Sequence, residues 1–339
     1  MYQHASGALL AAFADDLFLA CPVHAWEEIR RDLEARLTLK WSPELGPTRS
    51  RYLGRLWRRQ ADGSWQVRLP EAYWSDILEE VGLASARAAR TPGDPQRKAD
   101  ETPALGPEEH ALYRRIVGKL LWAASIRVDL AYITKELARQ VQSPSYSDWM
   151  RLRRVLRYVR GTQDYVLQLT GHEEPLEQQV LVYSDADYAM SADRKSTSGG
   201  VVFFQGVILT TWSRTQPVVA LSTAESELVA MSSAAQEGLL VRHVLEELGE
   251  RPILRLLTDS SSARAIVWRR GVGKVKHMQV RWLWLQDALR EGELQCDSVT
   301  TAANLADIFT KCLGAARHEA LTAALGLASC PLEVHEDRA

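Results

Sequence analysis

The sequence predicts a mixed α/β domain in its second half, preceded by a helical stretch and a short N-terminal β segment. From about residue 176 the pattern alternates between strands and helices in the order βββαβα(α)βα. Residues 108–170 instead repeat apolar side chains at helical spacing. Residues 1–55 begin with two apolar runs on either side of Asp15 and Asp16, which is typical of a β-hairpin.

The composition is that of a globular protein without a general affinity for polyanions. Hydrophobic residues make up 46% of the 339 residues, charged residues 25%, and the formal net charge is −2. A nucleic-acid-binding protein of this balance must gather its positive charge locally. The cysteines are scattered without zinc spacing, and no apolar run is long enough to span a membrane. We expect free thiols, no membrane contact, and a cytoplasmic or nuclear location.

The α/β region, which we place at residues 176–315, contains the elements on which the predicted chemistry depends. Its antiparallel hairpin turns at Gly206. The expected strands lie at residues 180–184, 200–205, 207–212, 254–258 and 293–299. The expected helices lie at residues 223–248, 262–269, 277–290 and 304–311.

Besides residues 1–55, three other segments complete the predicted organisation. Residues 56–104 contain a strand, a short helix and a charged linker with prolines, and residues 105–175 are helical. Residues 316–339 are expected to form a C-terminal tail.

One predicted helix carries a run of arginines opposite its apolar stripe. Arg153, Arg154, Arg157 and Arg160 lie on this face. A solvated helix face is the ordinary interpretation of such a run. In a chain without net positive charge, the same arginines are also candidates for contacts with a phosphate backbone.

Four acids are placed where they could act together. Asp185 and Asp259 end predicted strands, Glu227 lies near the start of the long helix, and Asp307 lies in the last helix. Strand ends and helix starts meet at one edge of an α/β sheet, where clustered carboxylates repel each other unless cations neutralise them. Mg²⁺ prefers carboxylate oxygens, and two such ions about 3.5–4 Å apart stabilise in-line displacement at phosphorus. The pattern predicts metal-dependent phosphodiester hydrolysis.

Two of these acids have rivals close by in the sequence. Asp187 shares a strand face with Asp185, because residues two apart point the same way. Glu225 competes with Glu227, but Ser222 and Glu225 fit a helix capping box. We therefore expect a structural role for Glu225 and a metal-binding role for Glu227.

Six ordered motifs between residues 180 and 313 closely resemble the ribonuclease H domain of copia-type retrotransposons. They are Tyr183-Ser-Asp-Ala-Asp-Tyr-Ala, Asp193-Arg-Lys-Ser-Thr-Ser-Gly, Gln216-Pro-Val-Val-Ala-Leu-Ser-Thr-Ala-Glu-Ser-Glu, Thr258-Asp-Ser, Lys276-His-Met-Gln-Val-Arg and Asn304-Leu-Ala-Asp-Ile-Phe-Thr-Lys. The resemblance implies a ribonuclease H-like mixed five-stranded sheet with flanking helices. It also implies that Asp185, Glu227, Asp259 and Asp307 are the catalytic and metal-binding acids.

The implied reaction is cleavage of the RNA strand of an RNA–DNA hybrid, with two Mg²⁺ ions as cofactors and Mn²⁺ as a substitute. Lys276 and His277 fall in a motif of the family, so both are candidates for nucleic-acid contact. For His277 a packing role is equally compatible with the sequence. An integrase uses three carboxylates at a different spacing, and the motifs found here argue against it.

The residues upstream resemble the C-terminal part of the reverse transcriptase of the same elements. Phe13-Ala-Asp-Asp resembles the polymerase turn Tyr-Val-Asp-Asp, and Tyr52-Leu-Gly resembles the primer-grip strand. The resemblance therefore implies a partial palm at residues 1–55, a thumb-like segment at 56–104 and a connection segment at 105–175.

A polymerase needs a third aspartate and a fingers region before this turn. We therefore expect Asp15 and Asp16 to be vestigial and this chain not to polymerise by itself. The leading hypothesis is a retrotransposon-derived ribonuclease H, acting with the remainder of a Pol polyprotein in virus-like particles or the nucleus. The alternative is an inactive relic that at most binds nucleic acid.

Overall fold

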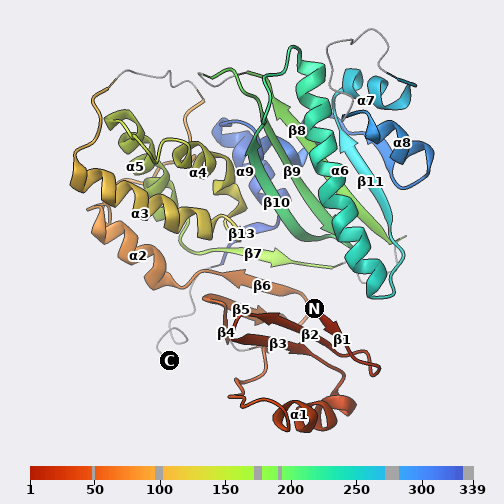
Figure 1. Ribbon diagram of the computed structural model, residues 1–339. Coiled ribbons are helices and arrows are strands. Elements are labelled where there is room, and N and C mark those ends of the chain that lie inside the picture. Colours follow the sequence, from red (N-terminus) through yellow and green to blue (C-terminus); the bar gives the residue numbers. More distant parts are fainter. Residues whose placement is uncertain (48–49, 96–101, 172–177, 190–192, 272–281, 331–339) are drawn as a thin grey trace.

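A computed structural model of the chain describes residues 1–47, 50–95, 102–171, 178–189, 193–271 and 282–330. Within these residues the strands form two five-stranded sheets and one small three-stranded sheet. We call them the α/β sheet, the antiparallel sheet and the N-terminal sheet. Figure 1 shows the α/β sheet with a long helix across it, helices on the other side of the molecule, and the N-terminal sheet below.

The α/β sheet has the strand order β10-β9-β8-β11-β12. β8, β9 and β10 are antiparallel neighbours, whereas β11 runs parallel to both β8 and β12. The carboxyl ends of β8 and β11 therefore lie at one edge of the sheet. Its strands are β8 (Gln179–Asp187), β9 (Thr197–Phe204), β10 (Val207–Thr215), β11 (Ile253–Thr258) and β12 (Gln295–Ser298). This mixed five-stranded sheet confirms the predicted fold class.

The turn between β9 and β10 lies where the sequence predicts it. Gln205 and Gly206 form a two-residue loop, and both have a positive φ, at 51° and 82°. Such a loop matches the twist of an antiparallel pair. Glycine adopts this backbone without strain, which explains why the hairpin turns at Gly206.

One face of the α/β sheet is covered by α6 (Thr223–Glu247), which crosses β8, β9 and β11 (Figure 1). The helix can approach the sheet closely at Gly238. A Cβ atom added there would lie 2.7 Å from side-chain carbons of Leu254 and of Val182. Helices α7 (Ser261–Trp268) and α8 (Trp284–Arg290) extend the same hydrophobic core.

The other face of this sheet packs against the helical segment. Val202 belongs to the core under α6, whereas its neighbours Val201 and Phe203 belong to the second core, because alternate strand residues point to opposite faces. That second core is shared with helices of the preceding segment. They are α2 (Glu71–Glu80), α3 (Pro107–Ala123), the short 3₁₀ helix η2 (Val128–Leu130), α4 (Ala131–Ala138) and α5 (Tyr146–Arg160).

The antiparallel sheet joins segments that lie far apart in the sequence. Its order is β13-β7-β6-β5-β4, with every neighbouring pair antiparallel. Its strands are β4 (Ser50–Tyr52), β5 (Arg55–Arg59), β6 (Trp65–Arg68), β7 (Tyr165–Leu169) and β13 (Leu327–Ser329). The segment predicted as a tail thus supplies both α9 (Ala315–Ala324) and β13, because Leu321, Leu325 and Leu327 are buried in the second core.

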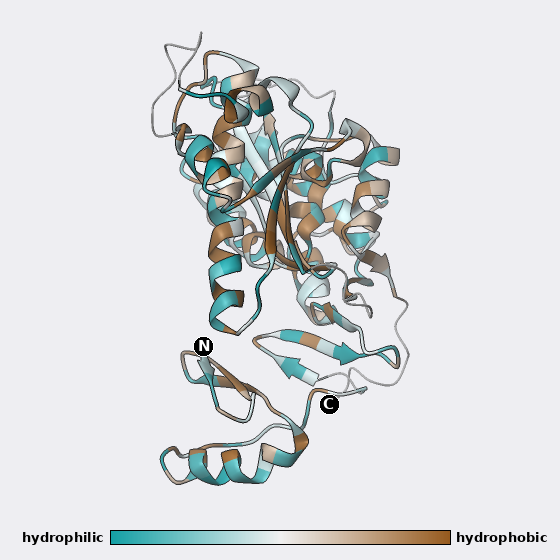
Figure 2. Ribbon diagram, turned by 90° about the vertical axis from the view of Figure 1, so that its right-hand side faces the viewer, coloured by the Kyte–Doolittle hydropathy of each residue, from teal (hydrophilic) through white to brown (hydrophobic). Residues whose placement is uncertain are grey.

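The N-terminal sheet carries the predicted hairpin. β1 (Tyr2–Gln3), β2 (Leu9–Phe13) and β3 (Asp16–Ala20) are antiparallel, and η1 (Val23–Ala25) and α1 (Trp26–Glu34) follow. Among the described residues this unit buries a separate cluster of only three side chains, those of Ala8, Ala25 and Ile29. Figure 2 shows it below the rest of the molecule, with hydrophilic residues along most of α1.

The final elements differ most from the sequence prediction. The segment 304–311, predicted as an α-helix, forms the 3₁₀ helix η5 (Leu305–Phe309), preceded by η4 (Thr301–Ala303). The side chain of Asn304 caps η5 by accepting a hydrogen bond from the Ala306 amide. The predicted helix 277–290 is described only from residue 282, with α8 beginning at Trp284. None of the described helices combines the length and apolar character needed to cross a membrane.

Candidate metal centre

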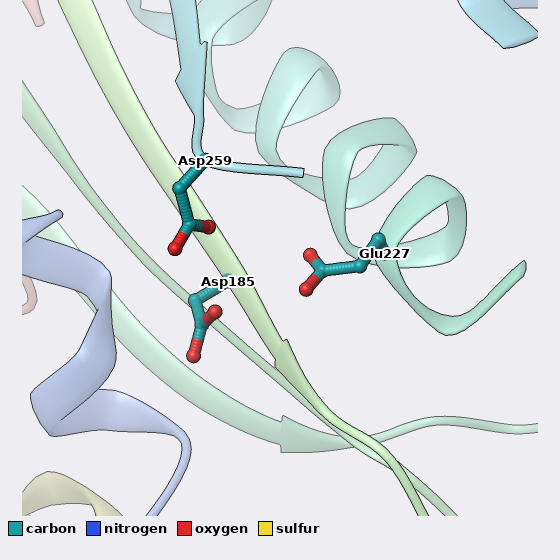
Figure 3. A group of neighbouring side chains, drawn as sticks. All are labelled: Asp185, Glu227 and Asp259. Carbon is teal, nitrogen blue, oxygen red and sulfur yellow. The ribbon is translucent and has the colours of Figure 1, made fainter. Parts of the chain in front are cut away.

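Three carboxylates from three different elements face a common space (Figure 3). Asp185 lies near the end of β8, Asp259 directly follows β11, and Glu227 lies in the first turns of α6. Each offers a carboxylate oxygen, and these oxygens all lie within 4.8 Å of one another. Parallel pairing of β8 with β11 places the two aspartates at the same sheet edge, as the sequence predicts.

The start of α6 separates the two glutamates in the way expected from the sequence. Ser222 is the N-cap, and its hydroxyl accepts a hydrogen bond of 3.2 Å from the Glu225 amide. The Glu225 carboxylate accepts a hydrogen bond of 2.7 Å from the Leu221 amide. Glu225 therefore stabilises the helix start, and Glu227, half a turn later, joins the aspartates.

Burial of these like charges makes the group electrostatically costly. Burial, together with the neighbouring charges of Asp185 and Asp259, raises the pKa of Glu227 to about 9. The pKa of Asp185 is also raised, mainly by burial. The Oε2 atom of Glu227 is buried and has no hydrogen-bond partner among the described residues. An all-oxygen donor set with an unsatisfied buried carboxylate fits a hard divalent cation.

The segment 304–311 holds two of the three acids in place. The Asn304 amide donates to the backbone oxygen of Ser184 at 3.1 Å and to Oδ1 of Asp259 at 3.2 Å. The hydroxyl of Thr310 donates to Oδ2 of Asp185. The sequence pattern indicates no role for either residue, although both lie in the motif that begins at Asn304, because their contacts are made across the fold.

Gly199 allows this segment to reach the sheet. It pairs with Asp185 across the β8–β9 ladder. A Cβ atom added to Gly199 would lie 2.6 Å from the Cβ of Phe309 and 2.7 Å from the Cγ2 of Thr310. The absence of a side chain here therefore permits η5 to lie against the strand beside the acids.

Asp307, the fourth predicted acid, is buried beside the three but is not a member of their group among the described residues. Lys311 Nζ lies 2.8 Å from its Oδ1 and 3.6 Å from Asp185 Oδ2. Arg317 of α9 lies 3.0 Å from its Oδ2. Asp187 also lies outside the group, and burial raises its pKa to about 6.

The remaining predicted residues lie elsewhere. Asp15 and Asp16 are exposed at the turn between β2 and β3, where Phe13 pairs with Asp16. Lys276 and His277 lie outside the described residues.

The α5 arginines contact the loop that follows α2. Arg157 Nε donates to the backbone oxygen of Arg87 at 2.7 Å, and Arg160 Nε donates to that of Ala84 at 2.8 Å. Arg153 makes a longer contact of 3.4 Å with the Val81 oxygen, and Arg154 donates to Thr91 at 3.1 Å. A cavity of about 460 Å³ lies beside them, lined by Leu83, Ala86, Arg87, Asp94, Met150, Arg153, Arg154 and Arg157.

The strand order of the α/β sheet, with acids at the ends of β8 and β11 and at the start of α6, defines a ribonuclease H-like domain. No protein-family model matches the chain. It is 29% identical over 251 residues to the Pol polyprotein of transposon TNT 1-94 from Nicotiana tabacum, covering 71% of this chain and 19% of that protein. It is 27% identical over 266 residues to that of transposon RE2 from Arabidopsis thaliana, covering 76% and 18%. Its homologues are thus copia-type retrotransposon Pol polyproteins, and the chain spans about a fifth of the length of these relatives.

Two further similarities concern parts of the chain. A match of 36% identity over 129 residues covers 38% of this chain and 89% of secreted RxLR effector protein 161 from Plasmopara viticola. Among solved structures, the N-terminal ribonuclease H domain of a Mycobacterium tuberculosis protein, fused to maltose-binding protein, is 18% identical. It covers 43% of this chain and 96% of that chain, with a TM-score of 0.28. The fold assignment therefore depends on strand order and pairing.

Proposed function

We propose that this chain is a metal-dependent ribonuclease H that hydrolyses the RNA strand of RNA–DNA hybrids. The observation that carries the proposal is the group formed by Asp185, Glu227 and Asp259, whose oxygens lie within 4.8 Å of one another at a strand edge. Retrotransposon Pol polyproteins as relatives support this choice among phosphodiester-cleaving reactions.

The proposed cofactor is a pair of Mg²⁺ ions, with Mn²⁺ as a substitute. Asp185, Glu227 and Asp259 would hold the first ion, and Asp185 and Asp307 the second. Bound Mg²⁺ would supply a Lewis acid that makes water a stronger nucleophile and stabilises the leaving oxygen.

Polar side chains of the segment 304–311 orient two of these carboxylates. Asn304 fixes the carboxylate of Asp259 relative to β8, and Thr310 orients that of Asp185. Glu227 must lose its proton to become a ligand, and its raised pKa makes that loss depend on the cation. Fixed ligands of this kind reduce the reorganisation needed during the reaction.

Substrate binding is assigned to positive side chains outside the acid group. Arg153, Arg154 and Arg157 line one cavity together with Arg87, and this local charge suits a phosphate backbone. We propose the same role for Lys276 and His277. Arg160 does not line this cavity, and its Nε donates to the backbone oxygen of Ala84. Asp15 and Asp16 are proposed to be vestigial, and polymerisation would require other parts of a Pol polyprotein.

Incubation of the purified chain with a strand-labelled RNA–DNA hybrid and Mg²⁺ tests the proposal. We expect cleavage of the RNA strand alone, lost in Asp259→Asn because the metal group loses a charged ligand. Asp297→Asn is the matched control, since Asp297 pairs with Arg255 at 2.9 Å on the neighbouring strand pair. Absence of cleavage by folded wild-type protein would contradict the proposal and favour an inactive relic.

A further inference from the structure

The acids of the metal centre fall into two sets that share Asp185. Asp185, Glu227 and Asp259 form the compact group. Asp307 approaches Asp185 from η5, on the side of the segment 304–311, and does not join that group within the described residues. The two sets therefore offer different places for a cation.

A side-chain cation already lies between Asp185 and Asp307. Lys311 Nζ is 2.8 Å from Asp307 Oδ1 and 3.6 Å from Asp185 Oδ2. Among the described residues, no basic side chain forms an ion pair with Glu227 or Asp259. The pair formed by Asp185 and Asp307 thus has a cation supplied by the chain itself, whereas Glu227 and Asp259 have none among the described residues.

Lys311 is placed so that it can leave this position. Its side chain is 41% exposed, whereas those of Asp185 and Asp307 are 5% and 6% exposed. A lysine ammonium is a point charge on a flexible stem, which can turn toward solvent without moving the backbone. The acids themselves have little such freedom.

Other contacts would keep the two acids in place after Lys311 departs. Arg317 holds Asp307 Oδ2 at 3.0 Å and also donates to the Thr301 backbone oxygen at 2.7 Å. The Thr310 hydroxyl holds Asp185. When the Lys311 ammonium is removed, Asp185 and Asp307 should therefore stay in place, and the position between them becomes free for another cation.

We propose that Lys311 is a resident cation that competes with the second metal ion for the position between Asp185 and Asp307. The inference rests on the proposed function. The first ion enters the compact group without displacing any protein cation, but the second must displace Lys311, because two cations cannot share one position at this distance. Lys311 is thus a positioning residue that makes the affinities of the two ions unequal.

Binding of Mn²⁺ alone to the full chain, measured by calorimetry and by electron paramagnetic resonance of free Mn²⁺, tests this without a cleavage assay. We expect wild-type protein to bind one ion tightly and a second weakly. Lys311→Met should bind the second ion at least about tenfold more tightly, the size expected from loss of one charge-assisted hydrogen bond. Lys311→Arg retains the charge and should keep the weak second step.

Lys119→Met is the matched control, because Lys119 pairs with Glu80 at 3.4 Å outside the centre. It should bind Mn²⁺ as wild-type protein does. If Lys311→Met is unfolded by circular dichroism, Lys311→Gln takes its place. Two equal steps in the wild type, or an unchanged second step in a folded charge-removing variant, would overturn the role of Lys311.

The failure of the proposed function has a different signature. If Asp259→Asn binds the first Mn²⁺ as well as wild-type protein does, the compact group is not the metal site, and both proposals fail. If only the effect of Lys311 is missing, while Asp259→Asn loses the first ion, the nuclease proposal stands and the competition does not.

Discussion

Among the acids of the centre, Glu227 has the carboxyl group whose pKa burial and neighbouring charges raise to about 9. Burial raises its pKa to about 9, well above the usual 4.5, and the charges of Asp185 and Asp259 act in the same direction. In the metal-free protein this side chain is therefore mainly protonated at neutral pH. A cation that binds the Glu227 carboxylate must displace the proton from it, and this couples metal binding to pH.

The sign of this coupling gives a stability prediction. Because the folded-state pKa is raised, the contribution of Glu227 to stability is fully present below pH 4.5 and is lost as pH rises toward about 9. Glu227→Gln lacks this loss. Without metal, we expect the free energy of unfolding of the variant to exceed that of wild-type protein at pH 8 by about 1 kcal/mol or more, and by less at pH 5.

Urea unfolding at the two pH values, with and without Mg²⁺, measures this difference. Mg²⁺ should stabilise wild-type protein at pH 8 and stabilise Glu227→Gln much less. Glu237→Gln serves as the control, since Glu237 lies on the same helix but pairs with Arg214 on the surface. If the stability of wild-type protein and that of Glu227→Gln depend on pH in the same way, the pKa of Glu227 is not raised by folding.

At the scale of elements, α5 combines two functions that its sequence pattern does not separate. Leu152, Val155, Leu156 and Val159 are fully buried, as the helical spacing predicts. On the opposite side, Arg157 and Arg160 bind backbone oxygens of the preceding loop at normal hydrogen-bond lengths. Arg153 has a longer contact of 3.4 Å and lines the cavity.

Two substitutions on this helix should therefore differ in effect. Arg160→Met removes the hydrogen bond to Ala84 and should destabilise the fold by about 1 kcal/mol. Arg153→Met should change stability little but reduce the salt dependence of hybrid binding, with a slope smaller by about one. Hybrid affinity across salt concentrations, in an Asp259→Asn background that cannot cleave, and thermal unfolding measure the two effects. If hybrid affinity depends on salt concentration equally in both variants, Arg153 has a structural role like that of Arg160.

At the scale of the whole molecule, a buried ion pair ties the helical segment to the C-terminal helix. Arg127 and Asp129 are paired at 2.7 Å with almost no exposed side-chain surface. Arg127 also donates to the Thr162 backbone oxygen, and the Tyr158 hydroxyl donates to Asp129 at 2.8 Å. His318 of α9 packs edge-on against Tyr158. These contacts connect η2, α5 and α9.

Removing one member of this pair should affect the whole fold. Arg127→Met leaves Asp129 buried without its cation and should cost about 3–5 kcal/mol. The double variant Arg127→Met/Asp129→Leu should recover much of this loss, because neither charge then remains buried. Urea unfolding of the single and double variants measures both values. A double variant as unstable as Arg127→Met would show that the pair contributes more than mutual neutralisation.

The sequence predicted much of the α/β region because its elements carry local signals. Gly206 marked the β9–β10 turn, and Ser222 with Glu225 marked the start of α6. The segment 304–311 was predicted as an ordinary helix, but Asn304 and Thr310 bind groups on β8 and after β11 instead. Such contacts depend on the packing of Gly199 against η5, which no periodicity reveals.

The sequence by itself indicated the fold class, the similarity to copia-type Pol polyproteins and the acids that could bind metal, because strand and helix patterns and motif order are local properties of the chain. Only the tertiary structure decided which acids meet: Asp185, Glu227 and Asp259 form one group, whereas Asp307 faces Lys311 and Arg317. It also decided that residues after 315 complete the antiparallel sheet. The physical reason is that the carboxylate group and the strand pairs join residues that are far apart in the sequence, and packing sets the distances between them.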